Sequence, residues 1–116
     1  MNQEELYRRF KETGQEQIRL ETALKGFFAE KKCGEGKYTR EYESYLKRRI
    51  RPSMECLIEA ENVEKIEYLE QLGWFDGQKI DDFIRIAGER HRQQALVCLL
   101  RIKNEKYGYK DKDFTL

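Results

Sequence analysis

Two segments of this chain share one pattern of apolar residues, 30 positions apart. We call this repetition the echo, and it restricts the folds that the chain can adopt. Ile66 and Leu69 recur as Leu96 and Leu99. A period near 30 residues is typical of stacked helical repeats, in which each helix pair buries its apolar face against the next pair. The echo therefore predicts two helix-turn-helix units in the C-terminal half of the chain.

The composition favours a folded, helical chain. Charged residues make up 39% and aromatic residues 12% of the 116 positions, while the formal net charge is only +1. Disordered chains are usually poor in aromatic residues and carry charge of mainly one sign, so we expect a folded protein. Pro52 is the only proline, and the abundant Glu, Lys, Arg and Leu favour helices.

The spacing of apolar residues predicts an all-α fold of about seven helices, because most segments place them at intervals of three and four. We expect residues 1–116 to form a single helical domain. Within it, residues 1–52 hold the N-terminal helices, 53–108 two repeat-like helix pairs, and 109–116 a polar tail.

Several residues predict where helices begin and end. We expect Gly14 to end the first helix in a left-handed conformation, Thr39 to cap a third helix, and Pro52 to interrupt the chain near residue 50. Asn62 can cap a fifth helix and Gly73 can close it.

Nothing in the sequence predicts a secreted or membrane-spanning protein. No stretch approaches the roughly 20 apolar residues of a membrane span, and the N-terminus lacks the apolar core of a signal peptide. Cys33, Cys56 and Cys98 have no CxxC spacing, so they predict neither a disulfide framework nor a zinc site. We therefore expect a cytoplasmic protein with no metal, no cofactor and no contact with a membrane.

Small residues lie near the end of the first helix in both copies of the echo, at Ala60 and at Ala87. Each second helix carries an apolar pair followed by leucine, and Gly73 ends the first of them. With these features residues 54–102 resemble ankyrin repeats, although the TPLH motif that opens the family's repeat is absent. The resemblance implies an alpha solenoid of stacked helical hairpins used for protein binding, preceded here by an N-terminal helical cap.

The sequence offers no catalytic set of residues. His91 is the only histidine, and the charges of Arg90 and Arg92 beside it disfavour a third positive charge. No glycine-rich phosphate loop, HExxH motif or calcium loop is present. We therefore expect a noncatalytic protein-protein interaction module, acting as an adaptor, inhibitor or regulatory subunit, with a protein partner that the sequence does not identify.

Charge is distributed unevenly along the chain. Residues 31–51 hold eight basic and three acidic side chains, a net +5, whereas residues 55–70 hold six glutamates and one lysine, a net −5. Because tyrosines precede the basic segment 47–51, the alternative function is nucleic-acid binding by phosphate contacts and base stacking. Two other interpretations of the basic segment remain. It could be a solvated face whose tyrosines are half-buried, or it could pair with the acidic segment.

The candidate partner-binding residues are aromatic or basic. Trp74 and Phe75 stand at a turn, where aromatic residues either anchor a partner or pack across the two hairpins. A homo-oligomer is compatible with either function, because an open helical stack leaves an apolar end, here near residues 96–100. The complete candidate set is Tyr38, Tyr42, Tyr45, Arg48, Arg49, Arg51, Trp74 and Phe75.

Overall fold

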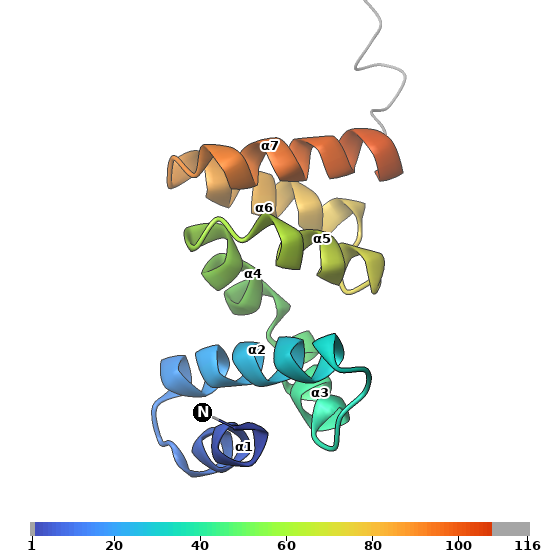
Figure 1. The fold of residues 1–116 in the computed structure, drawn as a ribbon. Helices are drawn as coiled ribbons and strands as arrows, with labels where there is room; N and C mark the ends of the chain where they lie inside the picture. The colour runs from blue at the N-terminus through green and yellow to red at the C-terminus, as the bar shows by residue number, and fades with distance from the viewer. Residues whose placement is uncertain (1, 108–116) are drawn as a thin grey trace, which may run out of the picture. The chain divides into compact units, whose positions relative to one another are not determined.

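The computed structural model describes residues 2–107, which form seven α-helices and a closing π-helical turn (Figure 1). No strand occurs in this range, so the predicted all-α fold of about seven helices is confirmed. The chain divides into two compact units, Met1–Ser53 and Met54–Leu116. The tail that we predicted over residues 109–116 lies outside the described residues.

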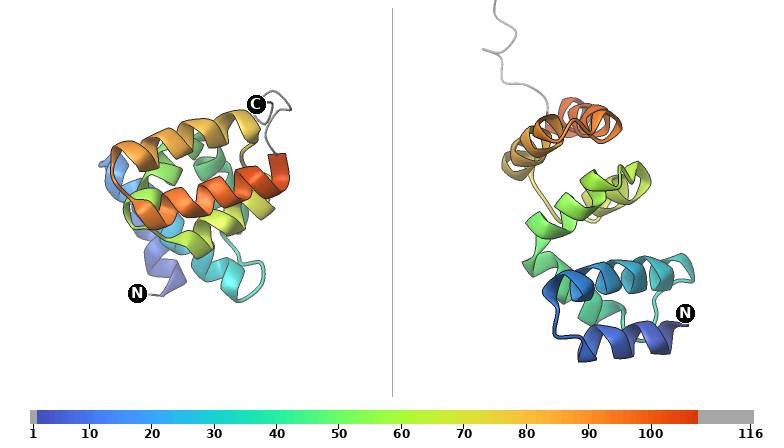
Figure 2. Two further views of the ribbon diagram at one scale, coloured as in Figure 1. Left: turned by 90° about the horizontal axis from the view of Figure 1, so that it is seen from above. Right: turned by 90° about the vertical axis from the view of Figure 1, so that its left-hand side faces the viewer.

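The first unit is built around an aromatic core. Its helices are α1 (Gln3–Glu12), α2 (Glu16–Lys32) and α3 (Thr39–Arg48). Helix α2 packs against both α1 and α3 (Figure 2). The ring of Phe10 lies between those of Tyr42 and Tyr45, with centroid distances of 5.2 and 5.1 Å. The i, i+3 spacing of these two tyrosines places both on the buried side of α3.

A buried carboxylate organises the loop between α2 and α3. Glu30 is 1% exposed and accepts hydrogen bonds from the backbone N–H of Tyr38, at 3.0 Å, and from the hydroxyl of Thr39, at 2.8 Å. It therefore lies at the positive end of the α3 dipole. The predicted cap was wrong: Tyr38 is the N-cap residue, and Thr39 is the first residue of the helix.

Two further helix boundaries differ from, or refine, the prediction. Helix α1 ends at Glu12, and its C-cap residue Thr13 is extended, with φ −68° and ψ 139°. The prediction that Gly14 ends this helix in a left-handed conformation was therefore wrong, since its φ is not positive. The interruption expected near residue 50 is confirmed, since α3 ends at Arg48 and α4 (Ile50–Glu59) follows after one residue. Pro52 lies in the first turn of α4, where a missing N–H removes no intrahelical hydrogen bond.

The second unit contains two helical hairpins. The first hairpin spans residues 54–71 and the second spans residues 77–102. Beyond α4, the elements are α5 (Val63–Gln71), α6 (Gly77–Glu89), α7 (Gln93–Ile102) and the π-helical turn η1 (Lys103–Tyr107). Helix α7 packs against α5 and α6, and η1 also contacts α6. The echo residues Ile66, Leu69 and Leu99 are fully buried, whereas Leu96 is half-buried.

The predicted caps of the first hairpin are confirmed. The Asn62 side chain accepts from the backbone N–H of Lys65 at 3.3 Å, and Gly73 has a left-handed φ of 77°. The N-cap residue of α6 is Asp76, whose carboxylate accepts from the backbone N–H groups of Gln78 and Lys79. None of the helices within residues 2–107 is both long enough and apolar enough to cross a membrane.

Candidate functional site

The turns of the two hairpins have the same backbone geometry 30 residues apart. Glu61 and His91 both have positive φ, 52° and 57°. In each turn the next N–H donates to a carbonyl five residues earlier at 2.9 Å, from Asn62 to Leu57 and from Arg92 to Ala87. This is the bond that closes a helix in a Schellman motif. The echo in the apolar pattern is thus also an echo in backbone conformation.

Acidic side chains of the first hairpin contact the second hairpin. Glu59 forms ion pairs with Arg90, at 3.5 Å, and with Arg92. Glu55 also pairs with Arg90, at 3.6 Å, and Glu67 with Arg101, while Glu70 pairs with Lys106 of η1 at 3.9 Å. The acidic segment 55–70 is therefore compensated by basic residues of the second hairpin within the same unit.

Glu61 also caps the helix opposite its own turn. Its Oε2 accepts from the backbone N–H of Gln94 at 2.7 Å and from that of Ala95 at 3.4 Å. The N-cap residue of α7, Arg92, makes no capping bond with its side chain. The first hairpin thus supplies the acceptor that the N-terminus of α7 needs.

The corresponding face of the second hairpin has a different chemistry. The residues 30 positions after Glu59, Glu61, Glu67 and Glu70 are Glu89, His91, Val97 and Leu100. Val97 is 65% exposed and Leu100 37% exposed, and they replace Glu67 and Glu70. Both belong to the apolar run of α7, whose other members Ala95, Cys98 and Leu99 are buried. The second hairpin therefore presents an uncovered apolar face.

This face continues along α7 and into η1 as an uncharged strip, which we call the α7 seam. Its members are Gln93, Val97, Leu100 and Asn104, all exposed and spaced by four, three and four residues. Helix α7 has one charged residue, Arg101, and it pairs with Glu67. Helix α5 carries four in nine. From the sequence we predicted an apolar end near residues 96–100 but did not identify the seam. The pattern that could have indicated it is four uncharged residues at helical spacing in a chain that is 39% charged.

Trp74 and Phe75 lie in the core of the second unit, 6% and 4% exposed. The Phe75 ring packs edge-on against Phe83 with centroids 5.2 Å apart, and its carbonyl accepts from the hydroxyl of Tyr107 at 3.1 Å. We had two interpretations of these residues, a partner anchor or internal packing. In the structure both side chains pack inside the second unit.

Two of the candidate tyrosines are also buried. Tyr42 is 1% exposed, and burial raises the pKa of its hydroxyl. Tyr45 is 7% exposed, and burial together with a hydrogen bond to Glu16 raises its pKa to about 12. Tyr38 is half-buried and stacks on Tyr7 with a centroid distance of 3.8 Å. These rings therefore pack within the first unit, away from any base that could stack on them.

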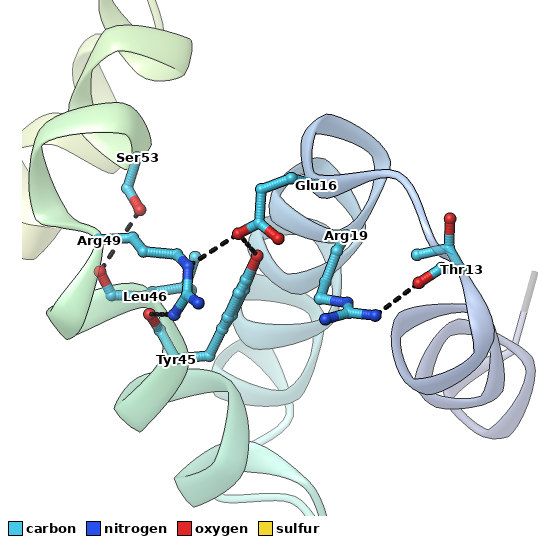
Figure 3. Close-up of polar contacts among 7 residues, drawn as sticks. All are labelled: Thr13, Glu16, Arg19, Tyr45, Leu46, Arg49 and Ser53. Carbon is cyan, nitrogen blue, oxygen red and sulfur yellow. Dashed lines mark hydrogen bonds and ion pairs between the residues drawn. The ribbon is translucent and has the colours of Figure 1, made fainter.

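Arg49 belongs to an internal cluster of the first unit (Figure 3). Its Nε lies 2.8 Å from Oε1 of Glu16, and its guanidinium lies 4.0 Å from the centroid of the Tyr45 ring. The same Glu16 oxygen accepts from the Tyr45 hydroxyl at 2.7 Å. The hydrogen bond from Tyr45 and the pairing with Arg49 lower the pKa of Glu16.

The other basic candidates face solvent. Arg48 and Arg51 are exposed, and the Arg48 guanidinium donates to the hydroxyl of Ser44 at 3.0 Å. Arg40 and Lys47 are exposed as well and share the Arg48 face of α3, because the spacing is seven and eight residues. We call Arg40, Ser44, Lys47 and Arg48 the α3 basic stripe. The structure thus adds Arg40 to the basic candidates, groups it with Lys47 of the predicted basic segment 47–51, and places Arg49 in the internal cluster.

The remaining reactive side chains are dispersed. Cys33 is exposed, Cys56 half-buried and Cys98 buried, and all are free thiols. His91, at the turn of the second hairpin, is exposed. Between residues 2 and 107 no three His, Cys, Asp or Glu side chains are grouped as a metal site requires. Comparison of the chain with protein-family models, curated proteins and solved structures finds no match.

Proposed function

We propose that this chain is a noncatalytic protein-protein interaction module of two ankyrin-like helical hairpins, and that it binds through the open face of the second hairpin. One observation carries this proposal. Val97 and Leu100 occupy, one repeat later, the positions of Glu67 and Glu70, which pair with Arg101 of α7 and Lys106 of η1. A hairpin face used for packing inside the chain is thus uncovered at its end.

Hydrophobicity gives this face its affinity. Covering both side chains would contribute roughly 1.5–3 kcal/mol, because fully burying one such side chain contributes about 1.5–3 kcal/mol and the exposed parts of Val97 and Leu100, 65% and 37%, amount to about one side chain. Exposed apolar residues on adjacent turns of one helix form a contiguous patch, and such patches are frequent at protein interfaces. The neighbouring seam residues Gln93 and Asn104 add hydrogen-bonding groups at the rim.

Affinity capture from the native host, with and without nuclease, tests the proposal. The baits are the wild-type chain, the variant Val97→Glu/Leu100→Glu, and the control Gln71→Glu/Gln78→Glu. The control adds the same charge at exposed positions of the same unit. We expect nuclease-resistant protein on the wild type and the control, and its loss from the seam variant. Capture of the same protein by all three baits would contradict the proposal.

Nucleic-acid binding is the second candidate function, and the α3 basic stripe favours it. Three basic side chains lie on one exposed helix face, so they could contact successive phosphates. The buried tyrosines supply no stacking platform, and affinity would depend on charge alone. We therefore expect binding that weakens steeply with salt.

Fluorescence anisotropy of a labelled oligonucleotide across a salt series tests this candidate. The variant Arg40→Ala/Arg48→Ala should lower both the affinity and the salt dependence. The control Lys79→Ala/Arg85→Ala, with the same loss of charge in the second unit, should bind as the wild type does. Binding that is absent, or insensitive to salt, would exclude this function.

A further inference from the structure

We infer that η1 is a clasp, which closes the end of α7 onto the start of α6 and opens while the rest of the second unit stays folded. Because α6 and α7 form a hairpin, η1 lies beside the start of α6 (Figure 2). The opening is independent of the proposed function. Its effect on the α7 seam rests on that function, because the seam includes the face proposed to bind.

Two ion pairs join η1 to elements that precede α7. Lys103 Nζ lies 2.9 Å from Oδ1 of Asp81 in α6. Lys106 Nζ lies 3.9 Å from Oε1 of Glu70, near the end of α5. Both lysine side chains reach solvent, and ion pairs of this kind contribute little to stability and weaken with salt. The two pairs alone therefore do not hold the turn closed.

Tyr107 makes the most specific contact of η1. Its hydroxyl donates at 3.1 Å to the carbonyl of Phe75, in the connection between α5 and α6. Its ring lies against Gly77, the first residue of α6, where a Cβ would lie 3.2 Å from Cγ and Cδ1 of the ring. A side chain at position 77 would therefore push the ring outward. We call the contact of Tyr107 with Phe75 and Gly77 the latch of the clasp.

The clasp has no packed side chain of its own. None of the five residues of η1 is buried, whereas Ile102, the residue before them, is 6% exposed. The backbone of η1 is π-helical, a rare conformation that is used mostly in single turns and frequently at functional sites. Segments with few buried apolar contacts open locally, without global unfolding. The boundary between the packed part of α7 and the clasp therefore lies after Ile102.

The clasp carries one end of the α7 seam. Asn104, the last seam residue, belongs to η1. The backbone N–H of Lys103 donates to the carbonyls of Leu99 and Leu100. An open clasp removes Asn104 from the seam and takes this donor from the last turn of α7. A protein bound along the whole seam would therefore select the closed clasp.

Amide hydrogen exchange of the full chain, followed for each residue by NMR in a urea series, tests the opening. We expect residues 104–107 to exchange at least about tenfold faster than residues 98–102, at a rate that low urea leaves unchanged, because a local opening exposes little surface. They should still exchange about tenfold slower than an unstructured chain, because the clasp is mostly closed.

Two results would overturn the opening. Equal protection and equal urea dependence in residues 98–102 and 104–107 would mean that η1 opens only together with the core. Exchange of residues 104–107 at the rate of an unstructured chain would mean that the clasp does not close.

Variants of the latch test its mechanism. Tyr107→Phe keeps the ring and removes the hydroxyl, so it should raise the exchange rates of residues 104–107 about two- to tenfold. Gly77→Ala should raise them as well, and should have no further effect in a Tyr107→Ala background, because both changes act through one ring. Lys79→Ala, an exposed change on α6, is the control and should leave them unchanged. Unchanged exchange in Tyr107→Phe, or an effect of Gly77→Ala that persists without the ring, would overturn the latch.

Affinity capture separates the clasp from the proposed function. We expect Tyr107→Ala to retain less of the protein that the wild type captures and that Val97→Glu/Leu100→Glu loses. Capture by Tyr107→Ala equal to that of the wild type, with η1 open by exchange, would overturn the effect on the seam and leave the binding proposal intact. Capture of the same protein by Val97→Glu/Leu100→Glu would overturn the binding proposal, whereas the opening would still be decided by exchange.

Discussion

Glu61 and His91 share one left-handed backbone conformation, with φ of 52° and 57°, at turns 30 residues apart. A left-handed conformation costs an L-residue roughly 1–2 kcal/mol, because Cβ approaches a carbonyl oxygen, whereas glycine has no Cβ. The two side chains differ in what they do. Glu61 caps α7, and His91 projects from an exposed turn.

His91→Gly should stabilise the chain. The substitution removes the left-handed cost, and the greater freedom of glycine in the unfolded state offsets part of the gain. We expect an increase of about 0.5–1 kcal/mol in the free energy of unfolding, measured by urea denaturation. His91→Ala is the control and should change stability little. A loss of stability in His91→Gly would show that the imidazole makes a stabilising contact.

Glu61→Gly should destabilise the chain although it relieves the same backbone cost. The carboxylate that accepts from Gln94 and Ala95 is lost, and loss of an N-cap acceptor costs about 0.5–2 kcal/mol. Because the backbone term cancels, the free energies of unfolding of Glu61→Gly and His91→Gly should differ by about 0.5–2 kcal/mol. Glu61→Gln keeps an acceptor oxygen and should fall between wild type and Glu61→Gly. Equal stabilisation by both glycines would contradict the cap.

Gly26→Ala and Gly88→Ala should have opposite effects. A Cβ on Gly26 would lie 2.5 Å from Cε2 of the buried Tyr42, and overpacking of this kind costs about 1–3 kcal/mol. A Cβ on Gly88 in α6 would meet no atom within 4 Å, so alanine should stabilise that helix by about 0.5–1 kcal/mol. Thermal denaturation of both variants measures the contrast. A stable Gly26→Ala would mean that the Tyr42 ring can move.

Stability should fall in acid. The pKa of Glu16 is lowered by the hydrogen bond from Tyr45 and that of Glu59 by the hydrogen bond from Arg92, both from an ordinary value of 4.5. Because the folded pKa values are the lower ones, this stability is fully present above pH 4.5. It is lost as the pH falls from there through the folded values. Urea denaturation between pH 3 and 7 should show this, and Glu59→Gln should flatten the dependence. An unchanged slope would contradict the assignment.

Local signals explain what the sequence could predict. Asn62 and Gly73 act within one turn of their own helices, so residue type alone indicated their roles. The same holds for the i, i+3 spacing that buries Tyr42 and Tyr45. The 30-residue echo located both hairpin turns because neighbouring repeats bury equivalent positions.

Contacts across elements explain the differences. Glu30 reaches the start of α3 from the preceding helix, so no local rule could show that Thr39 would donate to a carboxylate instead of capping. The compensation of the acidic segment by the second hairpin also depends on packing, since each pair is more than 30 residues apart in sequence. The sequence also could not predict that Val97 is exposed while Cys98 is buried. Both residues belong to one apolar run, and only the packing of α7 distinguishes them.

The contacts between the hairpins have a kinetic consequence. The bonds from Glu59, Glu61 and Glu67 to the second hairpin span 33, 33 and 34 residues. Forming one of them closes a loop of nearly the length that the others require, so the rest form with little further loss of chain entropy. Docking of the second hairpin on the first should therefore be a single cooperative step.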